Sequence, residues 1–334
     1  MLEPPPIKNE SIISYIHNTY GLQIELLVFL PLGADLNTSV FKASCADGNE
    51  YFVKLRSGAW NKASVTIPNY LSQAGLKHVI PTLKTRYGRS WGKLNGHYVI
   101  VFPFIVGCNG QEQKMTSKQW NDFGATLGRI HSFTIPAKLK KDIPWENFSS
   151  TWIDDLNIIL SRLSKEIFND PYIMALASYF QSKENVILKL INQTKQLRSI
   201  MQTKTHSYVL CHADIHHWNI LIEDKTKKLY VVDWDTLIYT PKERDLMFIG
   251  AGINESGYTH QIEKEMFYKG YGDVSIDIDI LNYYRGIRII EDLVVDCKQI
   301  FQISNSKEER KMSMENIRSN FKLNGTIDVA LQLF

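Results

Sequence analysis

Several stretches within the first hundred residues alternate apolar and polar positions, with the period of two that indicates β-strands. The stretch IELLVFLPLGADLNTSVFKASC predicts a strand, a turn around residues 33–37 and a second strand, and EYFVKLR predicts a third. The run HYVIVFPFIVG predicts another strand, closed by Pro103 and Gly107. A short helix over residues 11–20 precedes them. The N-terminal part is therefore expected to be a sheet accompanied by helices.

After residue 116 the apolar positions recur every three or four residues, which predicts amphipathic helices. The clearest of these stretches are KQWNDFGATLGRIHSF, WIDDLNIILSRLSKEIF, ASYFQSKENVILKLINQTKQL and YYRGIRIIEDLVVDCKQIF. Strands come first and helices follow, with the change near the apolar run that ends at residue 107. This order predicts two domains, residues 1–104 and 105–334, joined by a short hinge.

A local β signal interrupts the helical part. NILI (219–222) and LYVVD (229–233) are apolar runs separated by a polar turn, which predicts a hairpin. Pairing Ile222 with Leu229 places Asn219 opposite Val232, beside Asp233. Asn219 and Asp233 are therefore expected at the same open end of one hairpin.

Composition narrows the class of protein. The chain has 334 residues, of which 44% are hydrophobic and 22% charged, so it is long enough to bury one large or two moderate cores. It starts without the features of a signal peptide, and no apolar run approaches the ~20 residues that span a bilayer. The four cysteines include no C-x-x-C pair and are expected to be reduced thiols. These features predict a soluble, cytoplasmic protein.

Charge is distributed unevenly along the chain. The net charge is +3, but residues 51–111 contain no acidic residue and eight lysines and arginines. This segment should attract anions. It lacks a repeated basic and aromatic pattern, so a small phosphorylated ligand is favoured over nucleic acid, and a solvated basic face is the alternative.

The stretch CHADIHHWNILI brings three histidines close to Asp214 in sequence, which raises the question of a metal site. Zinc would require His212, His216 and His217 to converge as nitrogen ligands, which gives Asn219 no role. Side-chain oxygens from Asp214, Asn219 and Asp233 instead suit Mg²⁺. A magnesium-dependent site is therefore favoured, with a zinc hydrolase and a purely structural cluster as the alternatives.

The same residues carry a resemblance to a known family. His212-x-Asp214, Asn219 and then Asp233-x-Asp235 resemble the H-x-D-x-x-x-x-N and D-x-[DE] motifs of the aminoglycoside phosphotransferase family, relatives of protein kinases. The stretches YVLCHADIH and DWDTLIYTPKERDLMFIGAG look most like the spectinomycin phosphotransferase branch, and FYKGYG and YYRGIRIIED add to the match. The resemblance covers essentially the whole chain. It implies an α+β, protein-kinase-like bilobal fold, with a five-stranded antiparallel sheet and helices in the N-lobe and a mostly helical C-lobe.

The resemblance also implies roles for the motif residues. Asp214 would accept or orient the proton of the attacking hydroxyl. Asn219 and Asp233 would hold Mg²⁺. Asp235 would be an outer ligand or a contact to a cationic substrate. His212 would support the loop.

The implied nucleotide site lies in the N-terminal part. Lys54 would reach the α- and β-phosphates of ATP or GTP. The loop from Gly33 to Ser39, which includes Asn37, would lie over the triphosphate through its backbone N–H groups. Main-chain groups of the hinge would read the base, from Phe102, Phe104 or Ile105.

Two features depart from the family pattern. Kinases pair the nucleotide lysine with a glutamate on the first N-lobe helix, but WNKASVTIPNYLSQAGL contains no acid. The phosphates themselves, Ser64 or Thr66 could position Lys54 instead, or the free N-lobe could be loosely ordered. Relatives also often place glycine before the catalytic-loop asparagine, where this chain has Trp218, so the turn is wider or Trp218 packs against the acceptor pocket.

The implied acceptor is a cation, so its pocket should carry carboxylates and aromatic rings. Arg288 and Asp292 stand four residues apart and also suit an exposed helix pair. The candidate acceptor contacts are Asp235, Trp218, Tyr284, Arg288, Glu291 and Asp292.

The resemblance implies an ATP-dependent O-phosphotransferase that moves the γ-phosphate to a hydroxyl of an aminocyclitol or aminoglycoside antibiotic similar to spectinomycin, giving resistance. Its partner would be a cationic small molecule, with no nucleic acid and no membrane, and the protein would be a monomer. The alternatives are a kinase of the same fold that acts on choline, homoserine or a sugar, and a nucleotide-binding pseudokinase.

Overall fold

The computed structural model describes residues 4–33, 37–251 and 257–332. Its chain forms two compact units. Unit 1 comprises Met1–Gln113, Phe133–Pro144 and His217–Leu237, and unit 2 comprises Lys114–Ser132, Trp145–His216 and Ile238–Phe334. Residues 1–104 of the expected first domain all fall in unit 1, which also takes in two later segments.

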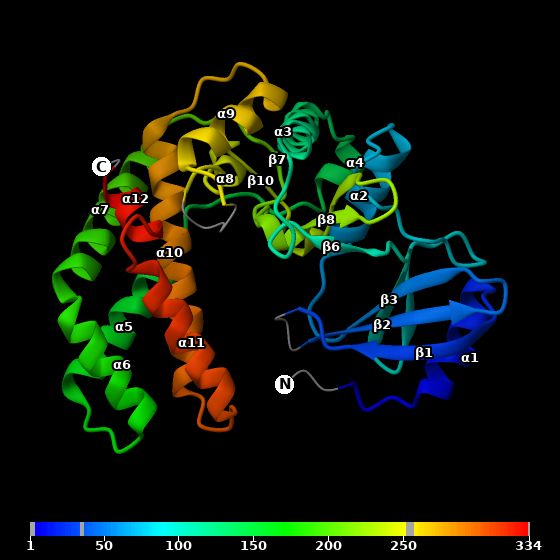
Figure 1. The fold of residues 1–334 in the computed structure, drawn as a ribbon, viewed down its shortest axis with the longest axis horizontal. Helices are drawn as coiled ribbons and strands as arrows, with labels where there is room; N and C mark the ends of the chain where they lie inside the picture. The colour runs from blue at the N-terminus through cyan, green and yellow to red at the C-terminus, as the bar shows by residue number, and fades with distance from the viewer. Residues whose placement is uncertain (1–3, 34–36, 252–256, 333–334) are drawn as a thin grey trace. The chain divides into compact units, whose positions relative to one another are not determined.

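The main sheet of unit 1 has five antiparallel strands in the order β1-β2-β3-β5-β4. Figure 1 shows its strands β1, β2 and β3 in blue. The prediction of a five-stranded antiparallel N-lobe sheet is thereby confirmed. The strands are β1 (Ile24–Leu30), β2 (Thr38–Cys45), β3 (Glu50–Arg56), β4 (Gly92–Leu94) and β5 (His97–Pro103).

Alternation along β3 separates the core from the candidate site. Val53 and Leu55 are fully buried in a core that also includes Ile12 and Ile16 of helix α1 (Asn9–Tyr20). Successive side chains of a strand point to opposite faces, so Lys54 projects from the other face of the sheet. The period of two therefore fixes where this lysine points.

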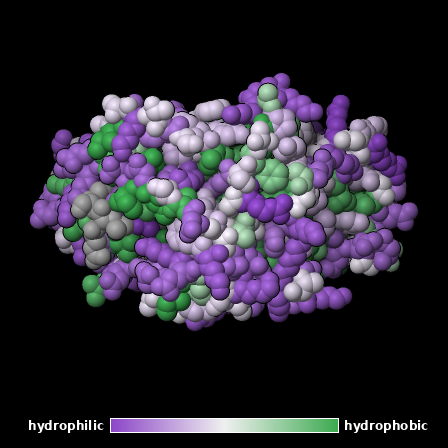
Figure 2. Space-filling view, turned by 90° about the horizontal axis from the view of Figure 1, so that it is seen from above, coloured by the Kyte–Doolittle hydropathy of each residue, from purple (hydrophilic) through white to green (hydrophobic). Residues whose placement is uncertain are grey.

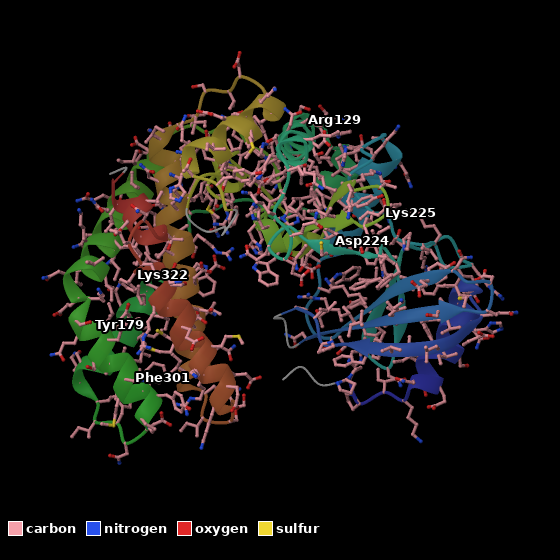
Figure 3. All side chains as sticks on the ribbon, viewed as in Figure 1. Arg129, Tyr179, Asp224, Lys225, Phe301 and Lys322 are labelled. Carbon is pink, nitrogen blue, oxygen red and sulfur yellow. The ribbon has the colours of Figure 1, made fainter. Side chains whose placement is uncertain are left out.

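The remaining elements of unit 1 include helices α2 (Ala63–Gln73) and α4 (Ala137–Lys140) and a three-stranded sheet. This sheet has the order β6-β8-β9, from β6 (Gly107–Asn109), β8 (Ile220–Glu223) and β9 (Leu229–Val231). Ile222 pairs with Leu229, and the N–H of Val232 donates to the carbonyl of Asn219 at 3.0 Å, so the predicted hairpin register is confirmed. Asp224 and Lys225 mark the turn of this hairpin in Figure 3.

Unit 2 is mostly helical, as expected. Its long central helix α10 (Ile278–Phe301) packs against six other helices of the unit, and Figure 1 shows it in orange beside α7 and α11. A two-stranded sheet of β7 (Val209–Cys211) and β10 (Ile238–Thr240) completes the unit. The other helices are α3 (Ser117–Ser132), α5 (Thr151–Lys165), α6 (Pro171–Ser182), α7 (Glu184–Thr203), α8 (Glu243–Leu246), α9 (His260–Tyr271), α11 (Lys307–Asn320) and α12 (Thr326–Gln332).

A buried ion pair ties α6 to α11. The carboxylate of Asp170 caps α6 by accepting from two backbone N–H groups at 2.9 and 3.1 Å. The same carboxylate accepts two hydrogen bonds from Arg310, at 2.9 and 2.7 Å. The hydrogen bonds from Arg310, more than the N–H groups of the cap, hold the pKa of Asp170 below its ordinary value. In Figure 3, α6 can be found by the label of Tyr179, and the end of α10 in the same unit by the label of Phe301.

The surface is mainly polar on the face that Figure 2 shows. Figure 2 shows a face that is mainly hydrophilic, with hydrophobic side chains in small groups between hydrophilic ones. None of the helices in the described residues combines the length and apolar character needed to cross a membrane. All four cysteines are free, as expected, and Cys45, Cys211 and Cys297 are buried.

Candidate active site

The loop that follows β7 contains the sequence motif, and its backbone is held by an aspartate more than thirty residues later. Asp245 of α8 accepts hydrogen bonds from the N–H groups of His212, at 3.0 Å, and Ala213, at 2.6 Å. Ala213 has a φ of 69°, a left-handed conformation that is unfavourable for a residue with a Cβ. Asp245 thus stabilises a strained backbone directly before Asp214.

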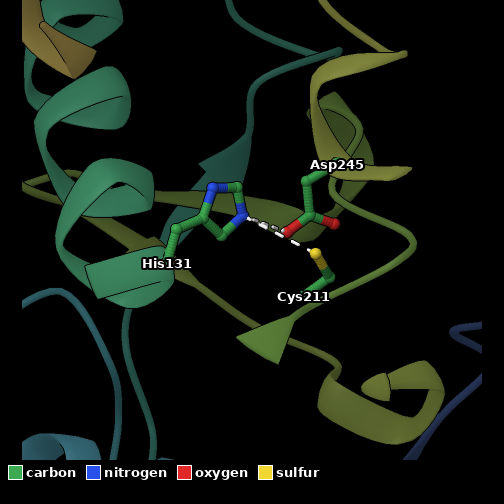
Figure 4. A group of neighbouring side chains, drawn as sticks. All are labelled: His131, Cys211 and Asp245. Carbon is green, nitrogen blue, oxygen red and sulfur yellow. Dashed lines mark hydrogen bonds and ion pairs between the residues drawn. The ribbon is translucent and has the colours of Figure 1, made fainter. Parts of the chain in front are cut away.

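Asp245 belongs to a buried group with His131 and Cys211, shown in Figure 4. His131 Nε2 donates to Asp245 at 2.9 Å, and its Nδ1 lies 2.7 Å from the hydroxyl of Tyr271. Burial raises the pKa of Asp245, but the hydrogen bond and charge of His131 outweigh it, so the pKa lies below its ordinary value. Burial raises the pKa of the Cys211 thiol well above its ordinary value. The donor atoms of this group are engaged in supporting the loop.

Asp214 itself is paired with a guanidinium. Arg288 Nη1 of α10 donates to Asp214 Oδ1 at 2.6 Å, and His216 Nε2 lies 3.3 Å from the same oxygen. Burial raises the pKa of Asp214, but His216 and Arg288 outweigh it, and the pKa lies well below its ordinary value. The carboxylate is therefore ionised at neutral pH.

Arg288 also contacts Asp292 on its own helix, where its Nε donates at 2.9 Å. Burial and the nearby carboxylates Glu291 and Asp296 raise the pKa of Asp292 to about 6, although Arg288 opposes this. The predicted pair of Arg288 and Asp292 is thus present, and its guanidinium reaches Asp214 as well.

The other candidate acceptor residues of unit 2 are placed differently from one another. Tyr284 is buried, and its hydroxyl lies 2.5 Å from Thr240 Oγ1 and donates to Glu146 at 3.2 Å. Glu291 is partly exposed and lies 3.9 Å from Arg244. Of these two residues, Glu291 is the one with a charged and partly exposed side chain that could contact an acceptor.

In unit 1, the turn after β9 carries Asp233 and Asp235. Asp233 has a φ of 59° and a ψ of 69°, and the 3₁₀ turn η2 (Trp234–Thr236) follows it. Lys54 Nζ donates to Asp235 Oδ2 at 2.7 Å and to Asp233 Oδ1 at 3.3 Å. Arg56 Nη1 donates to the same oxygen of Asp235 at 2.9 Å. Two cations of β3 thus contact the acidic turn, and Arg56 was not among the residues expected from the sequence.

The oxygens suited to a metal lie at the open end of the hairpin. Asn219 ends the 3₁₀ turn η1 (His217–Asn219), and its carbonyl pairs with Val232, next to Asp233. The side chain of Asp233 is 53% exposed. A carboxylate and an amide oxygen form a donor set that suits Mg²⁺ rather than zinc. Trp218 lies beside them in sequence and is 58% exposed.

The strand expected to bind the base is present as β5, and one main-chain N–H group directly after it already makes a hydrogen bond within the protein. The N–H of Phe104 donates to the carbonyl of Glu50 at 3.0 Å, while Phe102 and Ile105 flank the end of β5. In the expected phosphate loop, Gly33 has a φ of 92° and the carbonyl of Asn37 accepts from the N–H of Ser57, while Ser39 lies in β2. Residues 34–36 of that loop lie outside the described residues.

Comparison with known proteins agrees with the motif. A family model described as "Phosphotransferase enzyme family" matches residues 29–266. The crystal structure of spectinomycin phosphotransferase APH(9)-Ia with ADP and spectinomycin has a TM-score of 0.90 and 31% identity, covering 98% of this chain and 99% of that one. Its AMP-bound complex has a TM-score of 0.86 and 30% identity, with the same coverage.

A more partial match is Protein StrN of Streptomyces griseus, which is 26% identical over 179 residues. These are 52% of this chain and 55% of StrN, so the chain spans about half the length of that relative. The family model, in contrast, covers well over half of the chain and includes Lys54, Asp214, Asn219 and Asp233. The chain belongs to the phosphotransferase enzyme family, as a nucleotide-using enzyme of the aminoglycoside phosphotransferase type with a protein-kinase-like fold.

Proposed function

We propose that the chain transfers the γ-phosphate of ATP to a hydroxyl of an aminocyclitol antibiotic similar to spectinomycin, and so confers resistance. The observation that carries this proposal is the state of Asp214, an ionised carboxylate on a loop fixed by Asp245. The similarity to spectinomycin phosphotransferase over 98% of the chain supports this acceptor over other alcohols.

Lys54 would contact the phosphates, and main-chain groups near Phe102 and Ile105 would contact the base. Asn219 and Asp233 would hold Mg²⁺, which neutralises charge on the phosphate oxygens when it is bound. Asp233 has the exposed carboxylate that such a role requires. ATP is the proposed donor, and GTP would bind through the same phosphate contacts.

Asp214 would act on the acceptor hydroxyl. Because its pKa is depressed, it is a weak base in the resting site, and its first task is to orient the hydroxyl towards the phosphorus. The hydroxyl becomes acidic as the new O–P bond forms, and its proton moves to the carboxylate while the bond from the γ-phosphorus to the bridging oxygen breaks and ADP leaves. Positioning thus contributes more than basicity.

The acceptor would be recognised through its ammonium groups. Glu291 and Asp292 supply negative charge on α10, although Arg288 and Arg244 offset part of it. An ammonium that meets a partly buried carboxylate forms a charge-assisted hydrogen bond. We propose these two carboxylates as the acceptor contacts, and a monomer as the active form.

The test is ATP-dependent phosphorylation by the purified protein of spectinomycin, a set of multi-ring aminoglycosides, choline and homoserine, followed by ³¹P NMR. Spectinomycin should be phosphorylated, and Asp214→Asn should lower turnover ~10²-fold or more while ATP affinity stays within about twofold. Phosphorylation of choline or homoserine alone would replace the antibiotic with a metabolic acceptor. ATP binding without transfer to any acceptor would favour a pseudokinase.

A cellular assay separates the enzyme activity from the resistance role. Expression of the wild-type chain in a spectinomycin-sensitive bacterium should raise the inhibitory concentration of spectinomycin, and expression of Asp214→Asn at the same level should not. Equal protection by both would mean that binding alone, and not phosphorylation, gives resistance.

A further inference from the structure

The nucleotide lysine has a partner that the family pattern does not provide. Helix α2, which follows β3, contains no acidic residue in Ala63–Gln73. Lys54 instead donates to the two carboxylates after β9, and the contact to Asp235 is the shorter one, at 2.7 Å against 3.3 Å. The side chain of Lys54 is 14% exposed, so these carboxylates offset a largely buried charge.

Asp235 is itself held from several sides. Arg56 Nη1 donates to it at 2.9 Å and also to Thr38 Oγ1 at 3.3 Å. Helix α2 packs against the turn η2 that carries Asp235, and the Ser64 hydroxyl of α2 lies near this carboxylate. Ser64 is buried and accepts in turn from Trp60 Nε1 at 3.1 Å. Asp235 therefore joins β3 and α2 to the acidic turn.

Asp233 and Asp235 differ in how free their carboxylates are to bind a metal ion or a ligand. Asp233 is 53% exposed and makes the longer contact to Lys54, so it can turn to a metal ion at little cost. Asp235 is 24% exposed and is surrounded by Lys54, Arg56 and Ser64. A cationic acceptor would have to compete with two protein cations for this carboxylate.

We propose that Asp235 is a positioning residue for Lys54 and replaces the helix glutamate of other kinases, with Arg56 fixing its carboxylate and Ser64 lying beside it. This assignment rests on the proposed function only in taking Lys54 as a phosphate contact. It differs from the acceptor contact that the sequence suggested for Asp235. The contribution of α2 is a hydroxyl instead of a carboxylate.

Binding of ADP, measured by calorimetry with and without Mg²⁺, tests the proposal without any acceptor. Asp235→Asn keeps the size of the side chain and should weaken ADP about tenfold in both conditions, as the loss of one charge-assisted contact does. Weakening that requires Mg²⁺ would make Asp235 a metal ligand. Unchanged ADP binding with weaker spectinomycin binding would make it an acceptor contact. Either result overturns the proposal.

A double-mutant cycle shows whether Asp235 acts through the lysine. In a Lys54→Ala background, Asp235→Asn should change ADP affinity by less than about twofold, because no lysine remains to be positioned. An effect as large as in the wild type would overturn the proposal. Asp235→Glu should restore part of the affinity, and circular dichroism should confirm that each variant is folded.

A matched pair of variants on α2 tests the supporting hydroxyl. Ser64→Ala should weaken ADP binding by about threefold, since Asp235 loses the hydroxyl that lies beside it. Thr66→Val is the control, because the buried Thr66 hydroxyl makes no hydrogen bond in the described part of the chain. Equal effects of the two variants would show that α2 acts through packing alone and would remove Ser64 from the proposal. These outcomes concern nucleotide binding, so they stay interpretable even if spectinomycin is not the acceptor.

Discussion

Arg288 of α10, 74 residues later in the chain than Asp214, donates to its carboxylate at 2.6 Å. The same guanidinium donates to Asp292 at 2.9 Å, so one planar group fixes the orientation of two carboxylates. The proposed catalytic carboxylate therefore depends on α10 for its orientation as well as on its own loop.

Replacing Arg288 should impair catalysis without affecting the nucleotide. We expect Arg288→Gln to lower kcat about 10–100-fold, because Asp214 loses its orienting partner, with the ATP KM unchanged. Arg288→Lys should give an intermediate rate, since an ammonium keeps the charge but cannot bridge both carboxylates in the same geometry. Steady-state kinetics measure both. Arg244→Gln is the control, because Arg244 pairs with Glu291 instead, and an equal loss of kcat there would argue against a specific role for Arg288.

Acceptor binding should depend on pH through Asp292. Its pKa is raised to about 6, so the carboxylate is charged above pH 6 and neutral below it. We expect the acceptor KM to rise as the pH falls through about 6, because the ammonium loses its partner. In Asp292→Asn, initial-rate measurements should give a KM that is high and nearly constant between pH 5 and 7, about one pH unit on either side of the transition. A wild-type KM that is constant over this range would contradict the role of Asp292.

The strained backbone at Ala213 allows a prediction in both directions. Ala213→Gly should keep the activity and raise the melting temperature slightly, because glycine adopts a positive φ without a Cβ clash. Ala213→Val should lower both the activity and the melting temperature, since a β-branched residue is strongly disfavoured there.

The anchor of this loop can be tested separately. Asp245→Asn should reduce activity, because an amide cannot accept all the hydrogen bonds that the carboxylate accepts. Thermal unfolding and the phosphorylation rate measure these effects, and a fully active Asp245→Asn would show that the loop does not need this anchor.

The ion pair of Asp170 and Arg310 should stabilise unit 2. Asp170→Ala removes a helix cap and leaves the buried guanidinium of Arg310 without its carboxylate, a loss of roughly 2–4 kcal/mol in the free energy of unfolding. Because the pKa of Asp170 is lowered, this stabilisation is present above pH ~4 and is lost as the pH falls below it. Urea unfolding at several pH values tests both points. Glu166→Ala is the control, since its pair with Arg162 is exposed and should contribute little.

Local patterns in the sequence were enough to predict the sheet and the hairpin. Alternation placed Lys54 on β3, and the apolar runs on either side of a polar turn gave the register that joins Asn219 to Val232. The motif spacing gave the family. The strands, the hairpin register and the motif all depend on residues that are close together in the chain or in one hairpin.

Side-chain partners from distant segments could not be predicted in this way. The absence of an acid on α2 was evident, but nothing in the sequence indicated that Asp235, 181 residues after Lys54, would be its partner. Asp245 was within a stretch that carried the resemblance, yet its hydrogen bonds to His212 and Ala213 depend on how α8 packs beside β7. Such contacts follow from tertiary packing, which periodicity does not encode.

The partner of Lys54 has a consequence for control of the enzyme. Protein kinases that pair this lysine with a helix glutamate are switched on and off by the position of that helix. Here both carboxylates follow β9, on a turn that α2 does not carry, so a shift of α2 would remove the Ser64 hydroxyl from Asp235 but not the carboxylates from Lys54. In the described residues, the partner of Lys54 is therefore not carried by a helix whose movement could withdraw it.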